Sequence, residues 1–196
     1  MIYHLLLMKR FTFYLLLFSF LLVGCRPSAP PVSISDKPIS ASGGVPQTNL
    51  PMPPSKPLGE MTWSDFDGKT QKLADLKGKA VVLDFWATYC PPCLDEIPHL
   101  NELQAKYGAE NLQIVGLHAG DEEDLAKVPA FAERLKINYI LATPEDELLR
   151  FIFADKSEIP QTAVFNRDGK LIRKFVGFDL KIKNDLDKAV EEALKR

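Results

Sequence analysis

Two cysteines, Cys90 and Cys93, are separated by two residues and closely follow a run of mainly apolar residues at 80–87. A pair at this spacing can form and break a disulfide if the first sulfur reacts as a thiolate. The apolar run predicts a buried strand and the following residues predict a helix. The first sulfur would then lie at a helix N-terminus, where the helix dipole favours the thiolate. Zinc sites share the spacing, but they need four ligands and the chain has no second cysteine pair.

We therefore predict that Cys90 attacks a partner disulfide and that Cys93 resolves the mixed disulfide. Pro91 and Pro92 separate the two cysteines and carry no backbone N–H. The thiolate would depend on the Cys93 amide, the helix dipole and side chains, so we expect a reductant rather than a strong oxidant. The alternative is a structural disulfide, but so short a loop constrains little of the unfolded chain.

A carboxylic acid lies within the apolar run that precedes the cysteines. Asp84 stands among valine, leucine and phenylalanine residues, six positions before Cys90. Burial of a carboxylate disfavours its charged form, so we expect a raised pKa. The alternative is a structural aspartate with a local partner.

The N-terminal residues have the features of an export signal. Lys9 and Arg10 precede an apolar run at 11–23, which suits a signal-peptide core and is short for a membrane-spanning helix. The run ends in Leu-Val-Gly-Cys, which resembles the bacterial lipobox, where the cysteine, here Cys25, is lipidated. An ordinary secretory signal with a chance cysteine is the alternative.

A change in composition follows Cys25. Residues 26–57 are rich in proline, serine, glycine and alanine, which predicts a flexible tether. The predicted organisation is a signal peptide at 1–24, a lipidated cysteine and tether at 25–57, and a folded domain at 58–196. Without the signal peptide the chain has 22 basic and 26 acidic residues, so nothing favours nucleic-acid binding.

Hydrophobic periodicity predicts the elements of the folded part. Asp67-Gly68 marks a hairpin near 61–73. Further strands are predicted at 80–87, 112–117, 139–143, 162–166 and 170–176, and helices at 91–106, 125–135, 147–153 and 180–194. This order implies an α/β sandwich with a mixed sheet.

Several motifs resemble the thioredoxin superfamily. Residues 84–93, Asp-Phe-Trp-Ala-Thr-Tyr-Cys-Pro-Pro-Cys, resemble its active-site segment. Pro98, five residues after the second cysteine, matches its helix kink, and Ile159-Pro160 resembles its cis-proline loop. The resemblance implies a thioredoxin-like sandwich with a central mixed sheet, helices on both faces and an N-terminal β-hairpin.

Further segments are similar to the TlpA/ResA-like, membrane-anchored thiol–disulfide oxidoreductases. They lie at 63–68, 76–79 and 166–169. The resemblance implies an extracytoplasmic enzyme, lipid-anchored to a bacterial membrane, on the periplasmic face where a cell has two membranes. Its partners would be disulfide-containing exported proteins, such as apocytochrome c, and a membrane thiol–disulfide electron donor. We expect a monomer, no metal, and no cofactor beyond the Cys90–Cys93 disulfide.

The resemblance also assigns roles to single residues. Asp84 would lie beneath the cysteines and take the Cys93 proton during resolution. A cis bond at Pro160 would press its loop against the cysteines and expose the Ile159 backbone to an incoming peptide. Four further residues are expected to contact or border the partner: Trp86, packed near the disulfide, Tyr89 on the rim, and Pro91 and Pro92.

Two residues beside Pro160 depart from the family pattern. Glu158 and Gln161 are larger than the residues common there, so we expect them to alter the surface that meets a partner. Two rival functions remain. A copper chaperone on the same fold would add His99 or His118 as a third ligand, although such proteins generally have three residues between the cysteines. A peroxidase would need a threonine farther from the cysteine than Thr88 is.

Overall fold

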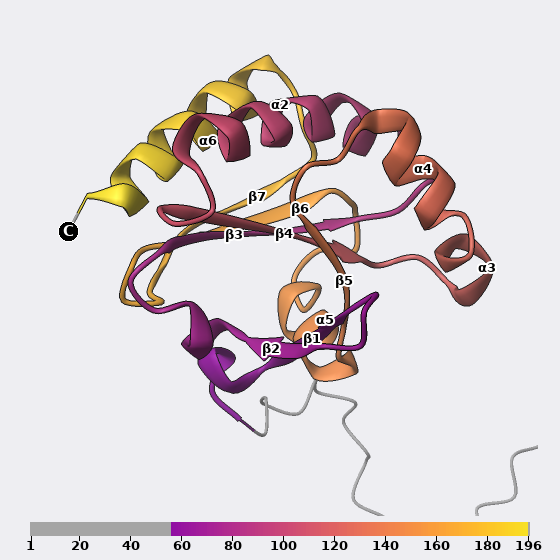
Figure 1. Cartoon of the computed structure of the whole chain (residues 1–196). Coiled ribbons are helices and arrows are strands. Elements are labelled where there is room, and N and C mark those ends of the chain that lie inside the picture. The colour runs from indigo at the N-terminus through magenta and orange to yellow at the C-terminus, as the bar shows by residue number, and fades with distance from the viewer. Residues whose placement is uncertain (1–55, 196) are drawn as a thin grey trace, which may run out of the picture. The chain divides into compact units, whose positions relative to one another are not determined.

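A seven-stranded mixed sheet, in the order β2-β1-β5-β4-β3-β6-β7, forms the centre of the structure (Figure 1). The computed structural model describes residues 56–195. The strands are β1 (Thr62–Asp65), β2 (Thr70–Lys72), β3 (Ala80–Trp86), β4 (Leu112–His118), β5 (Ile140–Pro144), β6 (Gln161–Phe165) and β7 (Leu171–Val176). β3 pairs with β4 and β4 with β5 in parallel, and the other neighbours are antiparallel.

Helices cover both faces of this sheet (Figure 1). They are α2 (Pro91–Tyr107), α3 (Glu122–Leu125), α4 (Val128–Leu135), α5 (Asp146–Ile152) and α6 (Leu180–Leu194), with short 3₁₀ turns η1 (Leu58–Glu60) and η2 (Leu73–Leu76). Residues of α2 and α6 pack on one face of the sheet, and those of α5 and η2 pack on the other. The predicted sandwich with an N-terminal hairpin is confirmed.

Strand β3 carries the residues that position the site. All seven of its residues are buried, because β4 and β6 flank it and helices cover both faces. Its side chains alternate: Leu83 and Phe85 join the core under α5, and Val82 joins the core under α2 and α6. Asp84 and Trp86 share the face of Val82, and this alternation places them under α2.

One predicted helix begins too early. The helix expected at 125–135 corresponds to α4, which starts at Val128, while Leu125 ends the separate helix α3. Asp121 caps α3 by accepting a hydrogen bond from the Asp124 amide, and Pro129 lies in the first turn of α4. A continuous helix would need the N–H that Pro129 lacks, so the chain starts a new helix there instead.

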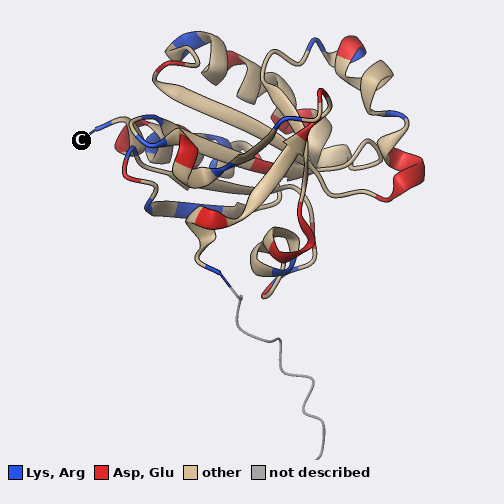
Figure 2. Ribbon diagram, turned by 60° about the horizontal axis from the view of Figure 1, so that its bottom comes forward, with Lys and Arg blue, Asp and Glu red and all other residues tan. Residues whose placement is uncertain are grey.

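The predicted signal peptide at 1–24, Cys25 and nearly all of the tether lie outside the described residues. Within 56–195, no helix combines the length and the apolar character that a bilayer span requires. Basic and acidic residues are interspersed along the chain of this part (Figure 2).

Candidate active site

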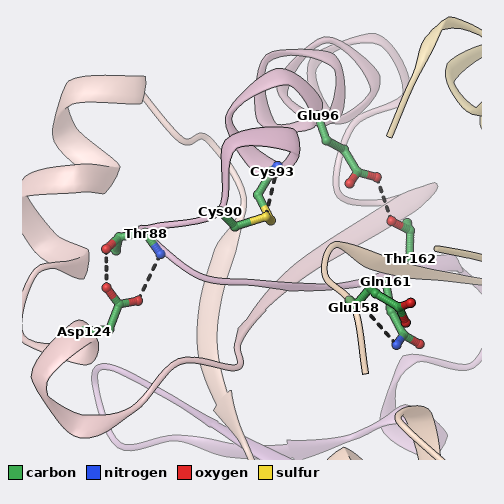
Figure 3. The surroundings of a disulfide bond; sticks show 8 residues. All are labelled: Thr88, Cys90, Cys93, Glu96, Asp124, Glu158, Gln161 and Thr162. Carbon is green, nitrogen blue, oxygen red and sulfur yellow. Dashed lines mark hydrogen bonds between the residues drawn. A yellow bond between two sulfur atoms is a disulfide. The ribbon is translucent and has the colours of Figure 1, made fainter. Parts of the chain in front are cut away.

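Cys90 and Cys93 form a disulfide at the N-terminus of α2 (Figure 3). Cys90 is the extended N-cap residue, and the backbone N–H of Cys93 donates to the Cys90 Sγ over 3.2 Å. Pro91 and Pro92 occupy the first helical positions, where a missing N–H costs no helical hydrogen bond. In this oxidised form the Cys93 amide already contacts the Cys90 sulfur, as its predicted support of the thiolate requires. Both cysteines are buried, with 4% and 1% of their surfaces exposed.

The residues around the disulfide form a rim on the surface. Tyr89 is 64% exposed, Pro91 is exposed and Pro92 is half-buried. The Ile159–Pro160 peptide bond is cis, as the resemblance implied. Ile159 packs against the cluster that contains both cysteines, so the cis-proline loop borders the disulfide.

Tyr89 and Ile159 line a hollow of about 640 Å³ beside the disulfide. The other lining residues are Ala119, Leu149, Arg150, Phe153, Ser157 and Glu158. The hollow therefore joins four segments: the residue before Cys90, the residue after β4, helix α5 with the residue that follows it, and the loop that leads to Pro160.

Trp86 lies behind the disulfide and is fully buried. Its ring stacks on that of Phe131, with centroids 5.1 Å apart, and meets the His118 ring edge-on at 5.8 Å. Its packing near the cysteines agrees with the prediction. In this oxidised form the ring has no exposed surface, so a direct contact between Trp86 and a partner is not found.

Two carboxyl groups are buried under α2. Asp84 is 1% exposed and Glu96, on α2, is 0% exposed. Burial raises the pKa of Asp84 well above its ordinary value, and the charge of Glu96 raises it further. Burial also raises the pKa of Glu96, to about 7, although a hydrogen bond from the Thr162 hydroxyl (2.6 Å) favours its ionised form. The direction predicted for the pKa of Asp84 agrees with its burial, and the raised pKa of Glu96 lies near neutral pH.

Strand pairing connects the two acids. Asp84 on β3 lies opposite Thr162 on β6, and Thr162 donates to Glu96 (Figure 3). Burial raises the pKa of the Tyr139 hydroxyl, and the charges of Asp84 and Glu96 raise it further, so these groups act on one another. Glu96 was missed in the sequence. The signal was its position three residues after Cys93, which places both on one side of the helix.

A third buried acid, Asp124, holds the segment before Cys90. Its carboxylate accepts hydrogen bonds from the Thr88 N–H (2.9 Å) and the Thr88 hydroxyl (Figure 3). It also accepts one from His118 Nε2 (2.8 Å). Burial acts to raise the pKa of Asp124, but these hydrogen bonds outweigh it and the pKa is lowered. The sequence analysis missed this residue, because nothing in the spacing distinguishes it from the other acids at 121–124.

Both histidines proposed as copper ligands have other partners. His118 bonds to Asp124, and His99 Nε2 lies 2.9 Å from an Asp187 oxygen. Among residues 56–195, no group of three or more histidine, cysteine or acidic side chains is arranged to hold a metal ion. The described residues thus offer no support for a copper site. Thr88, considered for a peroxidase, has its hydroxyl bonded to Asp124.

Comparison with known proteins agrees with this geometry. The family model described as Redoxin matches residues 50–190. The chain belongs to the Redoxin family. It is 34% identical over 114 residues to the thiol-disulfide oxidoreductase ResA of Bacillus thuringiensis (strain Al Hakam), covering 58% of this chain and 64% of that relative. It is 34% identical over 134 residues to ResA of Bacillus thuringiensis subsp. konkukian (strain 97-27), covering 68% of this chain and 72% of that relative.

A solved structure shows the same architecture. The thiol:disulfide interchange protein, a thioredoxin family protein, from Chlorobium tepidum TLS superposes with a TM-score of 0.59 and 29% identity. The match covers 71% of this chain and 98% of that one. The fold of this Redoxin family member is therefore thioredoxin-like.

Proposed function

We propose that this chain is a thiol–disulfide oxidoreductase that reduces disulfides of partner proteins by dithiol exchange. The observation that carries the proposal is the Cys90–Cys93 disulfide at the start of α2, bordered by a cis-proline loop and placed above buried acids. The names of the ResA relatives support it. Because the chain spans 64% of the first relative's length, the full activity of that protein is carried over only as part of this proposal.

Reduction of the partner begins at Cys90. In the reduced protein its thiolate attacks one sulfur of the partner disulfide. The partner S–S bond breaks, a mixed disulfide with Cys90 forms, and the other partner sulfur leaves as a thiolate. The Cys93 N–H and the α2 dipole stabilise the attacking thiolate. Since Pro91 and Pro92 donate nothing, the stabilisation is moderate, which suits a reductant.

Resolution of the mixed disulfide requires a proton transfer from Cys93. The Cys93 thiol gives its proton to the ionised carboxylate of Asp84 or Glu96, and the resulting thiolate attacks the Cys90 sulfur. The Cys90–Cys93 bond forms and the second partner sulfur leaves as a thiolate. The partner has gained two electrons and this protein has lost two. A membrane thiol–disulfide donor would return it to the dithiol form.

The proposed place of action is outside the cytoplasm, with lipidated Cys25 as anchor and exported proteins, such as apocytochrome c, as substrates. The apolar run before Cys25 and the proline-rich residues after it support this part of the proposal. An extended partner segment could bind along the rim formed by Tyr89 and Ile159. The reacting cysteine of the partner would then lie beside the exposed Pro91.

Trapping tests the activity and identifies the partner. Cells producing Cys93→Ala should accumulate a mixed disulfide through Cys90, and mass spectrometry of the captured protein names the substrate. Purified full-length wild type in detergent should catalyse insulin reduction with dithiothreitol, and Cys90→Ser should not. Cys25→Ser is the matched control: it should keep insulin reduction but leave the membrane fraction. Wild-type activity that persists in Cys90→Ser would refute the proposal.

A further inference from the structure

Gln161 fastens the loop that carries the cis-proline. It is the first residue of β6, directly after Pro160, and is 0% exposed. Its side-chain Nε2 donates to the Lys156 carbonyl oxygen (2.8 Å) and to the Glu158 carbonyl oxygen (3.0 Å; Figure 3). Both N–H bonds of the amide are therefore used to hold one loop.

The loop at 156–159 has few other attachments. Within the described part of the chain, the backbone of this loop makes no hydrogen bond besides the two from Gln161. Its neighbours are held separately: Lys174 Nζ bonds the Ile152 carbonyl and Asp155, and the Gly177 N–H bonds the Pro160 carbonyl. Lys156 and Glu158 are exposed, so their side chains add little packing.

This loop is one wall of the hollow beside the disulfide. Ser157, Glu158 and Ile159 line the hollow together with Tyr89, the residue before Cys90. Gln161 itself is buried, so its side chain is not part of the surface that meets a partner protein. Any effect of Gln161 on that surface must therefore act through the loop that it holds. Losing its two hydrogen bonds would free the wall without altering the cysteines or the buried acids.

We propose that Gln161 is a positioning residue for partner selection. By holding the Lys156 and Glu158 carbonyls, it fixes the wall of the hollow that receives a protein segment flanking the target disulfide. The inference rests on the proposed oxidoreductase function and adds a prediction to it: binding of a protein disulfide depends on Gln161, whereas attack on a small disulfide that does not fill the hollow does not.

The test compares Gln161→Met with Gln104→Met. Methionine keeps the length of the side chain but cannot donate. Gln104 is the matched control, because it is a buried glutamine on α2 whose Nε2 donates to the Leu112 carbonyl (2.9 Å), and it does not line the hollow beside the disulfide. Pre-reduced full-length protein in detergent is mixed with insulin or with hydroxyethyl disulfide. The rate of its oxidation is followed against disulfide concentration.

For Gln161→Met, the insulin concentration giving half-maximal rate should rise about tenfold, as the loss of two modest hydrogen bonds implies. The limiting rate and the rate with hydroxyethyl disulfide should stay within about twofold of wild type. Trypsin cleavage after Lys156 should accelerate by a similar factor of about ten, because local opening exposes that bond. Gln104→Met should change neither the preference between disulfides nor this cleavage.

Equal slowing of both disulfides by Gln161→Met, or the same loss of insulin preference in Gln104→Met, would overturn the proposal by assigning a merely structural role. If Gln161→Met lacks native circular dichroism, Gln161→Leu, which also has no donor in any protonation state, goes through the same comparison. A wild type that reduces neither disulfide would instead overturn the proposed function, so the two failures are distinguishable.

Discussion

Replacing Glu96 by glutamine tests whether this buried carboxyl group of α2 holds a proton in the folded protein. Burial raises the pKa of Glu96 from 4.5 to about 7. Below pH 4.5 the group is protonated in both the folded and the unfolded chain, and its contribution to stability is complete. Between pH 4.5 and 7 the unfolded chain loses this proton while the folded chain keeps it, so the free energy of unfolding falls as pH rises. Above pH 7 both states are ionised and the fall ends.

The size of this fall follows from the width of the window. Each pH unit costs ~1.4 kcal/mol, so the Glu96 contribution falls by about 3 kcal/mol between pH 4.5 and 7. Glutamine is neutral throughout, fills a similar volume and can still accept from the Thr162 hydroxyl. Glu96→Gln should therefore match wild type near pH 4.5 and exceed its unfolding free energy by about 3 kcal/mol at pH 8.

Equilibrium urea unfolding of the oxidised protein at pH 4.5 and pH 8 measures the difference. The matched control is Glu192→Gln, an exposed acid on α6, whose unfolding free energy should follow that of wild type within about 0.5 kcal/mol at both pH values. Asp84 remains in every variant, and its titration contributes to each curve. If Glu96→Gln lost as much stability as wild type between pH 4.5 and 8, the buried, protonated state of Glu96 would be refuted.

Three further substitutions test the packing around the site by urea unfolding at pH 7. Gly116→Ala should lower the unfolding free energy by about 1–3 kcal/mol, since its Cβ would come within 2.8 Å of Leu141 and 3.0 Å of Trp86; an unchanged value would show that the neighbours move freely. Asp124→Asn should lower it by about 1–3 kcal/mol, with the deficit shrinking below pH 4 as the wild-type carboxylate protonates; a deficit independent of pH would contradict this. Tyr139→Phe should leave it unchanged or raise it by up to about 1 kcal/mol, because the buried hydroxyl has no hydrogen-bond partner among the described residues; a clear loss would reveal a partner.

Local sequence signals were sufficient for the elements that form the sheet. The apolar run of β3 and the Asp67-Gly68 turn each predicted a structure that depends mainly on neighbours in sequence. The helix predicted at 125–135 begins too early. The apolar residues Leu125 and Val128 have helical spacing across the junction of α3 and α4, but Pro129 has no N–H to donate to a preceding turn, so α4 starts at Val128. Apolar spacing indicates which residues face the core, but it does not indicate which residues can donate a backbone hydrogen bond.

The cysteines and Asp84 of the candidate site were predicted from the sequence, whereas Glu96 and Asp124 were not. Cys90 and Cys93 are separated by two residues, so their chemistry is visible in one short segment. Glu96 acts through Thr162, 66 residues away, and Asp124 through Thr88, 36 residues away. The pairing of β3 with β6 creates the first contact, and the ends of β3 and β4 meet to create the second. No spacing rule within one segment could identify either.

The positions of these acids explain why a stable core tolerates them. A buried carboxyl group lowers stability near neutral pH, and hydrophobic residues of similar size would fill the space under α2 without that cost. Asp84 and Glu96 nevertheless occupy it, on the side of α2 that also carries Cys93, where the proposed mechanism takes up a proton whenever the disulfide re-forms. Carboxyls whose pKa values are raised toward neutral are stronger bases for that proton than an exposed carboxylate would be. In the proposed mechanism, the stability that Glu96→Gln should restore at pH 8 is the cost of keeping a proton acceptor on the same side of α2 as Cys93.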